Sequence, residues 1–148
     1  MKFLLPVLLL GVSCTFAQMP AVAPSAEKAP APDLRPRIYD LAGVLGNEGF
    51  KFRDGAWTGC LQGGKQQRLV VNLFAGNQYW FCGATSDSGE TPSLSVRDPS
   101  GHPVETVDFG RDGIAAVGVT AAATGCYTLE IKGSSAGSRE FCLLYLFK

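Results

Sequence analysis

Short apolar segments separated by turn residues dominate the chain after residue 37 and limit what it can fold into. Apolar and polar side chains alternate with a period of two in these segments, and no window shows the 3.6-residue period of an amphipathic helix. Glycine and proline, 18 and 9 of the 148 residues, mark the turns between the segments. The predicted strands are residues 68–74, 78–82, 93–96, 104–109, 114–120, 125–131 and 141–147.

This spacing of strands and turns predicts an all-β fold, an antiparallel, jelly-roll-like β-sandwich of about eight strands over residues 37–148. Helix is expected only as a short piece near residues 38–45. Both faces of the last predicted strand are apolar, so this strand is expected at the centre of a sheet and covered on both sides. The other predicted core residues are Leu69, Val71, Leu73, Tyr79, Phe81, Leu94, Val96, Val117, Val119, Tyr127, Leu129 and Ile131.

The first 17 residues have the features of a secretory signal peptide. Lys2 supplies the positive charge, residues 4–12 supply the apolar run, and the small residues Thr15 and Ala17 precede a cleavage site after Ala17. The run is too short for a transmembrane helix, which needs about 20 apolar residues. We therefore expect a secreted or periplasmic protein.

Cys14 leaves a second interpretation of this segment open. Ser13 and Cys14 fit the end of a lipoprotein signal, although Gly11 stands where a branched apolar residue is usual. In that case the protein is a lipoprotein anchored to a membrane through an acylated Cys14. The cleaved signal peptide remains the favoured interpretation.

Residues 18–36 form a segment rich in proline and alanine without apolar periodicity. Such a segment buries too little apolar surface to offset the entropy of ordering it. Repeated proline favours an extended polyproline II chain. We therefore expect a linker between the export signal and the domain at 37–148.

Four cysteines remain once the signal peptide is removed. An even number in a small exported domain predicts two disulfides. A zinc site is disfavoured because zinc ligands usually come in close pairs such as CxxC. Four cysteines allow three connectivities, and the favoured one pairs Cys60 with Cys142, because first and last strands often neighbour each other in sandwiches. That choice leaves Cys82 paired with Cys126 and predicts a disulfide-stapled domain.

Several motifs follow one another in a characteristic order along the chain. They are Trp57-Thr-Gly-Cys-Leu61 with Gly64, Val71-Asn-Leu-Phe-Ala-Gly76, Tyr79-Trp-Phe81, Leu94-Ser-Val-Arg-Asp98 with Gly101, Val117-Gly-Val119 and Thr124-Gly-Cys-Tyr-Thr-Leu-Glu-Ile131. In this order they resemble the bacterial pre-peptidase C-terminal (PPC) domain, over about residues 52–147. The resemblance implies a jelly-roll-like sandwich of the kind that accompanies exported enzymes and in some cases binds collagen, polysaccharide or calcium.

The chain departs from that family in two respects. No enzyme domain accompanies the sandwich within these 148 residues, and the four cysteines are not a family requirement. Because one fold serves many functions, the resemblance is a better guide to the fold of this chain than to its function.

The remaining composition argues against most kinds of chemistry. Thirteen basic and thirteen acidic residues leave no net charge, which disfavours nucleic acid and anionic membranes as partners. His102 is the only histidine, so a multi-histidine metal site is excluded, and no serine sits in a GxSxG elbow. Residues 59–65 match the start of a P-loop, but Gln66 stands where the magnesium-binding hydroxyl belongs. We therefore expect no enzyme, no cofactor and no metal.

The loop carboxylates fit no known calcium-loop spacing either. Calcium needs several converging oxygen ligands, and an EF-hand supplies them at fixed intervals. The carboxylates concerned are Asp87, Glu90, Asp98, Asp108 and Asp112.

Aromatic side chains give the one indication of a binding site. If Tyr79 and Phe81 face the core, Trp80 faces the other way. For Trp57, as for Trp80, the sequence leaves open whether the side chain is exposed or covered. An exposed indole can stack on a sugar ring or contact a protein partner, unless loops or the N-terminal segment cover it.

We therefore expect an exported, non-catalytic binding or accessory module. Its ligand would be a polysaccharide, an extracellular protein or a cell-envelope component. The alternatives are a lipid-anchored structural or assembly protein of the envelope and, less expected, a small secreted hydrolase with an unrecognised site.

Overall fold

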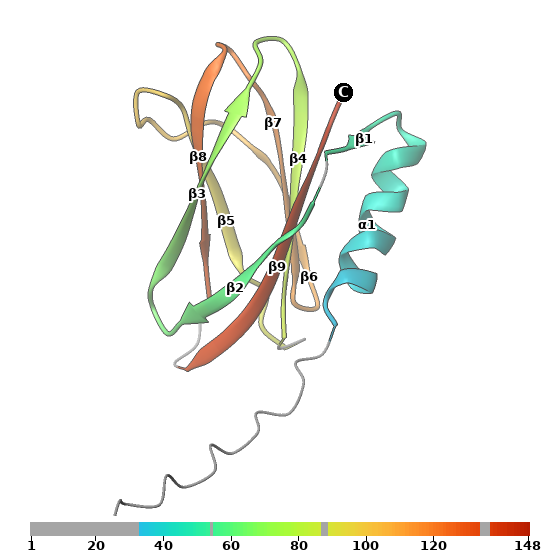
Figure 1. Cartoon of the computed structure of the whole chain (residues 1–148), viewed down its shortest axis with the longest axis vertical. Coiled ribbons are helices and arrows are strands. Elements are labelled where there is room, and N and C mark those ends of the chain that lie inside the picture. The colour runs from blue at the N-terminus through green and yellow to red at the C-terminus, as the bar shows by residue number, and fades with distance from the viewer. Residues whose placement is uncertain (1–32, 54, 87–88, 134–136) are drawn as a thin grey trace, which may run out of the picture.

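The computed structural model of the chain describes residues 33–53, 55–86, 89–133 and 137–148. The predicted signal peptide, Cys14, most of the predicted linker and Asp87 lie outside the described residues. Within the described part the chain forms one helix and nine strands (Figure 1). They are α1 (Arg35–Asn47), β1 (Lys51–Phe52), β2 (Trp57–Gln62), β3 (Gln66–Leu73), β4 (Gln78–Thr85), β5 (Ser93–Arg97), β6 (Val107–Arg111), β7 (Ile114–Thr120), β8 (Gly125–Lys132) and β9 (Ser138–Phe147).

The strands form two antiparallel sheets. The larger has the order β1-β9-β4-β7-β6, and β2 pairs with the first half of β9 while β1 pairs with its end. The smaller has the order β3-β8-β5. Figure 1 shows the smaller sheet on one side of the molecule, facing the larger sheet, with the helix beyond the larger sheet. This arrangement confirms the predicted all-β antiparallel sandwich.

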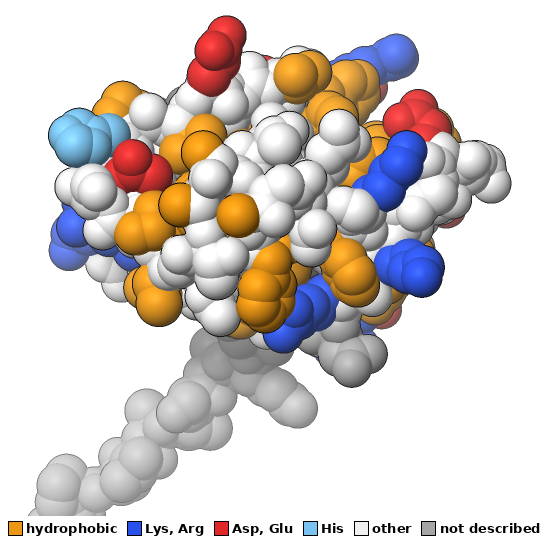
Figure 2. Space-filling model, turned by 90° about the horizontal axis from the view of Figure 1, so that it is seen from above, with side chains coloured by type: hydrophobic (Ala, Val, Ile, Leu, Met, Phe, Trp, Pro, Cys, Tyr) orange, Lys and Arg blue, Asp and Glu red, His pale blue; other side chains and the backbone are white. Residues whose placement is uncertain are grey.

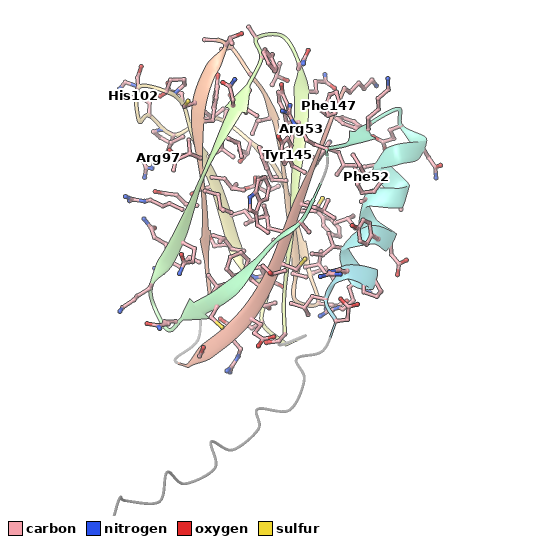
Figure 3. All side chains as sticks on the ribbon, in the orientation of Figure 1. Phe52, Arg53, Arg97, His102, Tyr145 and Phe147 are labelled. Carbon is pink, nitrogen blue, oxygen red and sulfur yellow. The ribbon has the colours of Figure 1, made fainter. Side chains whose placement is uncertain are left out.

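The main core lies between the two sheets. Phe81, Leu129 and Ile131 are fully buried there, as their alternation predicted. Tyr145 points into the same space and packs against Phe81, with ring centroids 5.4 Å apart (Figure 3). Of the predicted core residues, Leu69 is only half-buried, because β3 is an edge strand and leaves one side of its face uncovered.

A second apolar cluster lies on the outer face of the larger sheet, under α1. Ile38 and Ala42 of the helix are fully buried against Leu144 and Leu146 of β9. Strand β9 therefore has apolar neighbours on both faces, which confirms the prediction for the last strand.

Helix α1 is longer than the short piece predicted at 38–45. It begins at Arg35, inside the predicted linker, and Pro36 occupies its first turn, where its fixed φ angle suits a helix start. Its buried residues recur every three or four positions along one face. No helix of the described residues is long and apolar enough to cross a membrane.

Candidate functional site

The segment between β5 and β6 crosses from the smaller sheet to the larger one. The Val104 N–H donates a hydrogen bond to the Val96 carbonyl (2.9 Å), so this residue still belongs to the smaller sheet. From Val107 onward the chain pairs with β7, opposite Gly118. The strand predicted at 104–109 therefore begins three residues later than predicted, at Val107, and ends two residues later, at Arg111.

The crossing leaves a groove at the edge of the larger sheet. The β6–β7 ladder ends at Gly118, so the last residues of β7 still pair with β4 but have the crossing segment, and no strand, on their other side. The groove has a volume of about 500 Å³. Its lining residues are Phe50, Gln78, Tyr79, Trp80, Val104, Glu105, Thr106, Val107, Gly118, Val119 and Thr120.

Trp80 forms part of this groove because of its position in the sheet. It lies on β4 directly opposite Gly118 of β7, on the face of the sheet away from the main core. A Cβ atom on Gly118 would lie only 2.9 Å from two atoms of the indole ring, so the ring lies across a position that must lack a side chain. The half-buried indole packs against the cluster under the helix and presents its remaining surface to the groove.

The rest of the lining combines apolar and hydrogen-bonding groups. Phe50 is buried and Val107 is largely exposed, and both are apolar. Gln78, Glu105 and Thr120 are exposed polar residues of the same lining. An apolar surface with a few polar groups around it is typical of a small-molecule site.

Trp57 does not share this arrangement. Its ring stacks on Tyr145, with centroids 5.4 Å apart and ring planes 8° from parallel. The side chain is half-buried against the main core, and it is not among the lining residues of the groove. The structure therefore separates the two tryptophans that the sequence could not distinguish.

The four cysteines within the described residues are free thiols, so the prediction of two disulfides is wrong. Cys82 lies on β4 in the cluster under the helix, whereas Cys126 is exposed on β8 of the other sheet. Cys82 therefore lies on the outer face of the larger sheet and Cys126 on the outer face of the smaller one, with the main core between them, so the Cys82–Cys126 pairing does not form.

The favoured pair Cys60 and Cys142 is closer but is also unbonded. Cys60 lies opposite Glu140, and Cys142 lies opposite Thr58, so the two cysteines are diagonal neighbours across β2 and β9. Diagonal neighbours have Cα atoms about 7–8 Å apart, beyond the usual disulfide range of about 4.4–6.8 Å.

Both thiols of this diagonal pair line a second groove, of about 490 Å³, next to the start of α1. Cys60 is exposed there, and Cys142 is buried, which raises the pKa of its thiol. No group of three or more potential metal ligands occurs in the part of the chain that the structure describes.

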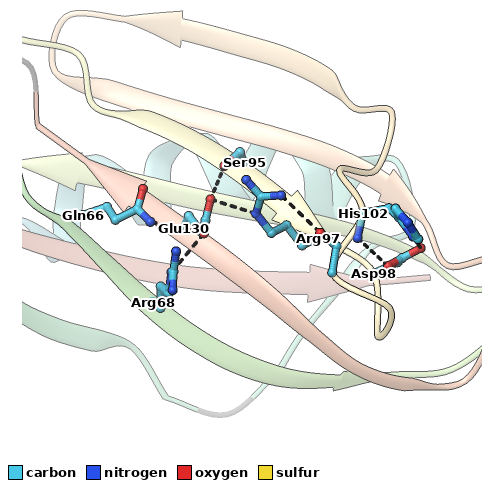
Figure 4. A network of polar contacts seen from close by, with 8 residues as sticks. Gln66, Arg68, Ser95, Arg97, Asp98, His102 and Glu130 are labelled. Carbon is cyan, nitrogen blue, oxygen red and sulfur yellow. Dashed lines mark hydrogen bonds and ion pairs between the residues drawn. The ribbon is translucent and has the colours of Figure 1, made fainter.

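A polar network on the outer face of the smaller sheet is centred on Glu130 of β8 (Figure 4). Its Oε1 atom accepts hydrogen bonds from Arg68 Nε (3.0 Å) and Gln66 Nε2 (3.3 Å). Its Oε2 atom is 3.3 Å from Arg97 Nε and accepts a hydrogen bond from Ser95 Oγ, also at 3.3 Å. The carboxylate is almost inaccessible to solvent, with 7% of the side chain exposed. Sequence reasoning missed this network because its members come from three strands.

Burial of Glu130 by itself raises the pKa of the carboxyl group. The hydrogen bond from Arg97 and the positive charges of Arg97 and Arg68 outweigh that effect, so the pKa is lowered from its ordinary value. Glu130 is therefore ionised at neutral pH and holds both guanidinium groups.

His102 lies in the exposed turn that follows β5. The Asp98 carboxylate accepts hydrogen bonds from the N–H groups of Ser100 and His102, at 2.9 and 2.8 Å. The imidazole Nδ1 atom is 3.6 Å from Asp98 Oδ2. Its side chain is 77% exposed and projects from the surface in Figure 2. His102 therefore belongs to a hydrogen-bonded turn on the surface, as expected for a turn histidine.

Glu130→Gln tests the electrostatic role of the network. The pKa of Glu130 is lower in the folded state, so its stabilising contribution is complete above the unfolded-state pKa and is lost as pH falls through the folded-state value. We expect the variant to be less stable than wild type by about 1–2 kcal/mol at pH 7, with the difference shrinking toward pH 3. Urea unfolding at pH 7, 5 and 3 measures this. Glu48→Gln, at an exposed position, is the control and should change little. A difference that is independent of pH would contradict the electrostatic account.

Comparison with protein-family models finds none that matches the chain, and comparison with curated proteins finds no match either. The fold and the geometry of these surfaces are therefore the basis for the function proposed below.

Proposed function

We propose that the chain is an exported, non-catalytic binding module that holds a sugar ring of a polysaccharide in the groove beside Trp80. The observation that carries this proposal is the indole lying across Gly118 in a groove of about 500 Å³ with polar residues around it. Export is the expectation from the first 17 residues of the sequence. We also propose that the sandwich has the jelly-roll-like arrangement of the PPC domains it resembles, some of which bind polysaccharide.

The groove suits the two-sided chemistry of a sugar. A pyranose ring has an apolar face of C–H groups, which stacks on an aromatic surface such as Trp80. Its hydroxyl groups lie at the edge of the ring, where Gln78, Glu105 and Thr120 can exchange hydrogen bonds with them. One such site holds a single sugar weakly, on the order of 1 mM, or about −4 kcal/mol. A polymer that presents many copies of the sugar gains by avidity.

The same lining favours binding over hydrolysis. Glycoside hydrolysis normally uses two carboxyl groups on either side of the scissile bond. Among the described residues that line the groove, Glu105 is the one carboxylate. The proposal of a small secreted hydrolase therefore has no support from this site. The lipid-anchored alternative depends on Cys14, outside the described residues.

Trp80→Leu and Trp57→Leu form a matched pair that tests the proposal. Both tryptophans are half-buried, but only Trp80 lines the groove. In native gels containing soluble neutral polysaccharides (a β-glucan, a xylan, a mannan and starch), we expect at least one polymer to retard the wild-type protein. Trp80→Leu should raise the apparent dissociation constant by about tenfold, equivalent to about 1.4 kcal/mol of stacking and burial.

Trp57→Leu should bind as the wild-type protein does, and circular dichroism should show that both variants are folded. Equal binding by Trp80→Leu and wild type would contradict the proposal. So would a wild-type protein that none of the polymers retards. Gln78→Ala changes an exposed residue on the rim of the groove, so its effect on polysaccharide binding is a second test that does not depend on packing under the helix.

A further inference from the structure

The outer face of the smaller sheet carries an excess of positive charge. The outward-facing side chains of β3, β8 and β5 include three basic residues, Arg68, Arg97 and Lys132. Glu130 is the one acidic residue among the outward-facing side chains of these strands. Because the whole chain has no net charge, this excess is local to the face. The face lies on the opposite side of the sandwich from α1 (Figure 1).

Glu130 orients the two arginines without neutralising both of them. It binds each guanidinium group through the Nε atom, at 3.0 Å for Arg68 and 3.3 Å for Arg97. Arg97 also donates from Nη1 to the Gly101 carbonyl (3.1 Å). Within the described residues, the terminal nitrogens of Arg68 have no hydrogen-bond partner. The two arginine side chains are 63% and 42% exposed, so solvent and ligands reach them.

Such fixed guanidinium groups are suited to carboxylate ligands. The planar fork of an arginine matches a carboxylate with two parallel hydrogen bonds. Since Glu130 already holds each side chain, binding immobilises fewer free rotamers and costs less entropy. Around the arginines, Gln66, Ser95 and Thr128 add hydrogen-bonding groups that suit a hydroxyl-rich ligand.

We propose that the outer face of β3, β8 and β5 binds an acidic polysaccharide through its uronate carboxylates, with Arg68 and Arg97 as the charged contacts. A polynucleotide fits this face less well, because it requires a longer basic stripe to offset one phosphate per nucleotide. This site goes beyond the proposed function and does not depend on it. Trp80 and its groove belong to the other sheet, so the two proposals fail separately.

Polygalacturonate and its fully methyl-esterified form test the proposal, because the two polymers share a backbone and differ in charge. We expect the full mature protein to bind polygalacturonate and to bind the ester at least about tenfold more weakly. Binding should weaken as the salt concentration rises from about 20 to about 300 mM, since exposed charges are screened. Biolayer interferometry with each polymer immobilised measures both effects.

Arg68→Gln is the informative variant, and Arg111→Gln is its matched control. Both remove one exposed arginine charge, but Arg111 lies on β6 of the other sheet, beside Asp112. Arg68→Gln should weaken binding to polygalacturonate by about tenfold. Arg111→Gln and Trp80→Leu should leave it unchanged.

Four outcomes would overturn the proposal. They are a wild-type protein that does not bind polygalacturonate, equal binding of the methyl ester, equal loss in Arg68→Gln and Arg111→Gln, and binding of poly(U) as tight as that of polygalacturonate. The third result would indicate an effect of net charge alone, and the fourth would indicate a general polyanion surface.

Discussion

Replacing Phe81 with alanine should lower the free energy of unfolding by about 3–5 kcal/mol, the range for truncating a fully buried aromatic side chain. Phe81 lies on β4, the central strand of the larger sheet between β9 and β7, and has no exposed surface. Its ring packs on Tyr145 between the two sheets. The surrounding side chains come from both sheets and cannot all move in to fill the space.

Phe109→Ala is the matched control, because it removes the same atoms from an exposed site. Phe109 is 47% exposed on the edge strand β6. We expect a loss below about 1 kcal/mol there, as for most surface substitutions. Urea unfolding followed by fluorescence measures both values.

If Phe81→Ala does not fold, Phe81→Leu provides the test. It retains most of the volume and should cost on the order of 1.5 kcal/mol. A cost for Phe81→Leu no larger than that for Phe109→Leu would show that the space between the sheets is not the stabilising core.

The core was predictable because a strand has a simple geometry. Side chains alternate between two faces, so Tyr127, Leu129 and Ile131 are assigned to one face without any knowledge of the partner strands. The apolar character of both faces of β9 likewise identified the strand that has the other sheet on one side and α1 on the other.

Helix α1 was underestimated because its pattern is weak. Its buried positions Ile38, Ala42 and Leu45, with Leu34 just before the helix, have the spacing of one helix face. Gly43 and Gly46 lie among them, however, and glycine lowers helix propensity. Packing against the outer face of β9 and β4 supplies the stability that the local sequence lacks.

The groove and the polar network depend on pairing between strands, which a single sequence does not specify. Alternation indicated that Trp80 faces away from the core, but only the register reveals that Gly118 lies directly opposite. In the same way, Arg68 faces Glu130 because β3 and β8 are neighbours in that register. The favoured Cys60–Cys142 pairing failed for this reason too: β2 and β9 are neighbours, as it assumed, but the register sets the two cysteines diagonally and not directly opposite each other.

Among the four cysteines of the described residues, the native protein should react rapidly with a thiol reagent at Cys60 and Cys126 and only slowly at Cys82 and Cys142. Cys60 and Cys126 are exposed. Cys82 has no exposed surface, and burial raises the pKa of its thiol to about 12. Cys142 is 2% exposed, and burial raises the pKa of its thiol as well.

The expected difference in rate is large because two factors act together. The thiolate is the reactive form, and at pH 8 a thiol with a pKa of about 12 is ionised in only about one molecule in ten thousand. Burial also excludes the reagent until the strand pair opens. We expect the buried thiols to react at least about a thousandfold more slowly than the exposed ones.

Labelling with iodoacetamide at pH 8, followed by mass spectrometry, counts the reactive thiols in the mature protein without reductant. Cys60→Ser and Cys126→Ser should each remove one rapidly labelled site, whereas Cys82→Ser should remove none. In denaturant, all four cysteines should be labelled. If labelling in denaturant required prior reduction, the cysteines would be bridged in the protein after all, and the packing of β2 against β9 would have to bring Cys60 and Cys142 closer than the diagonal register allows.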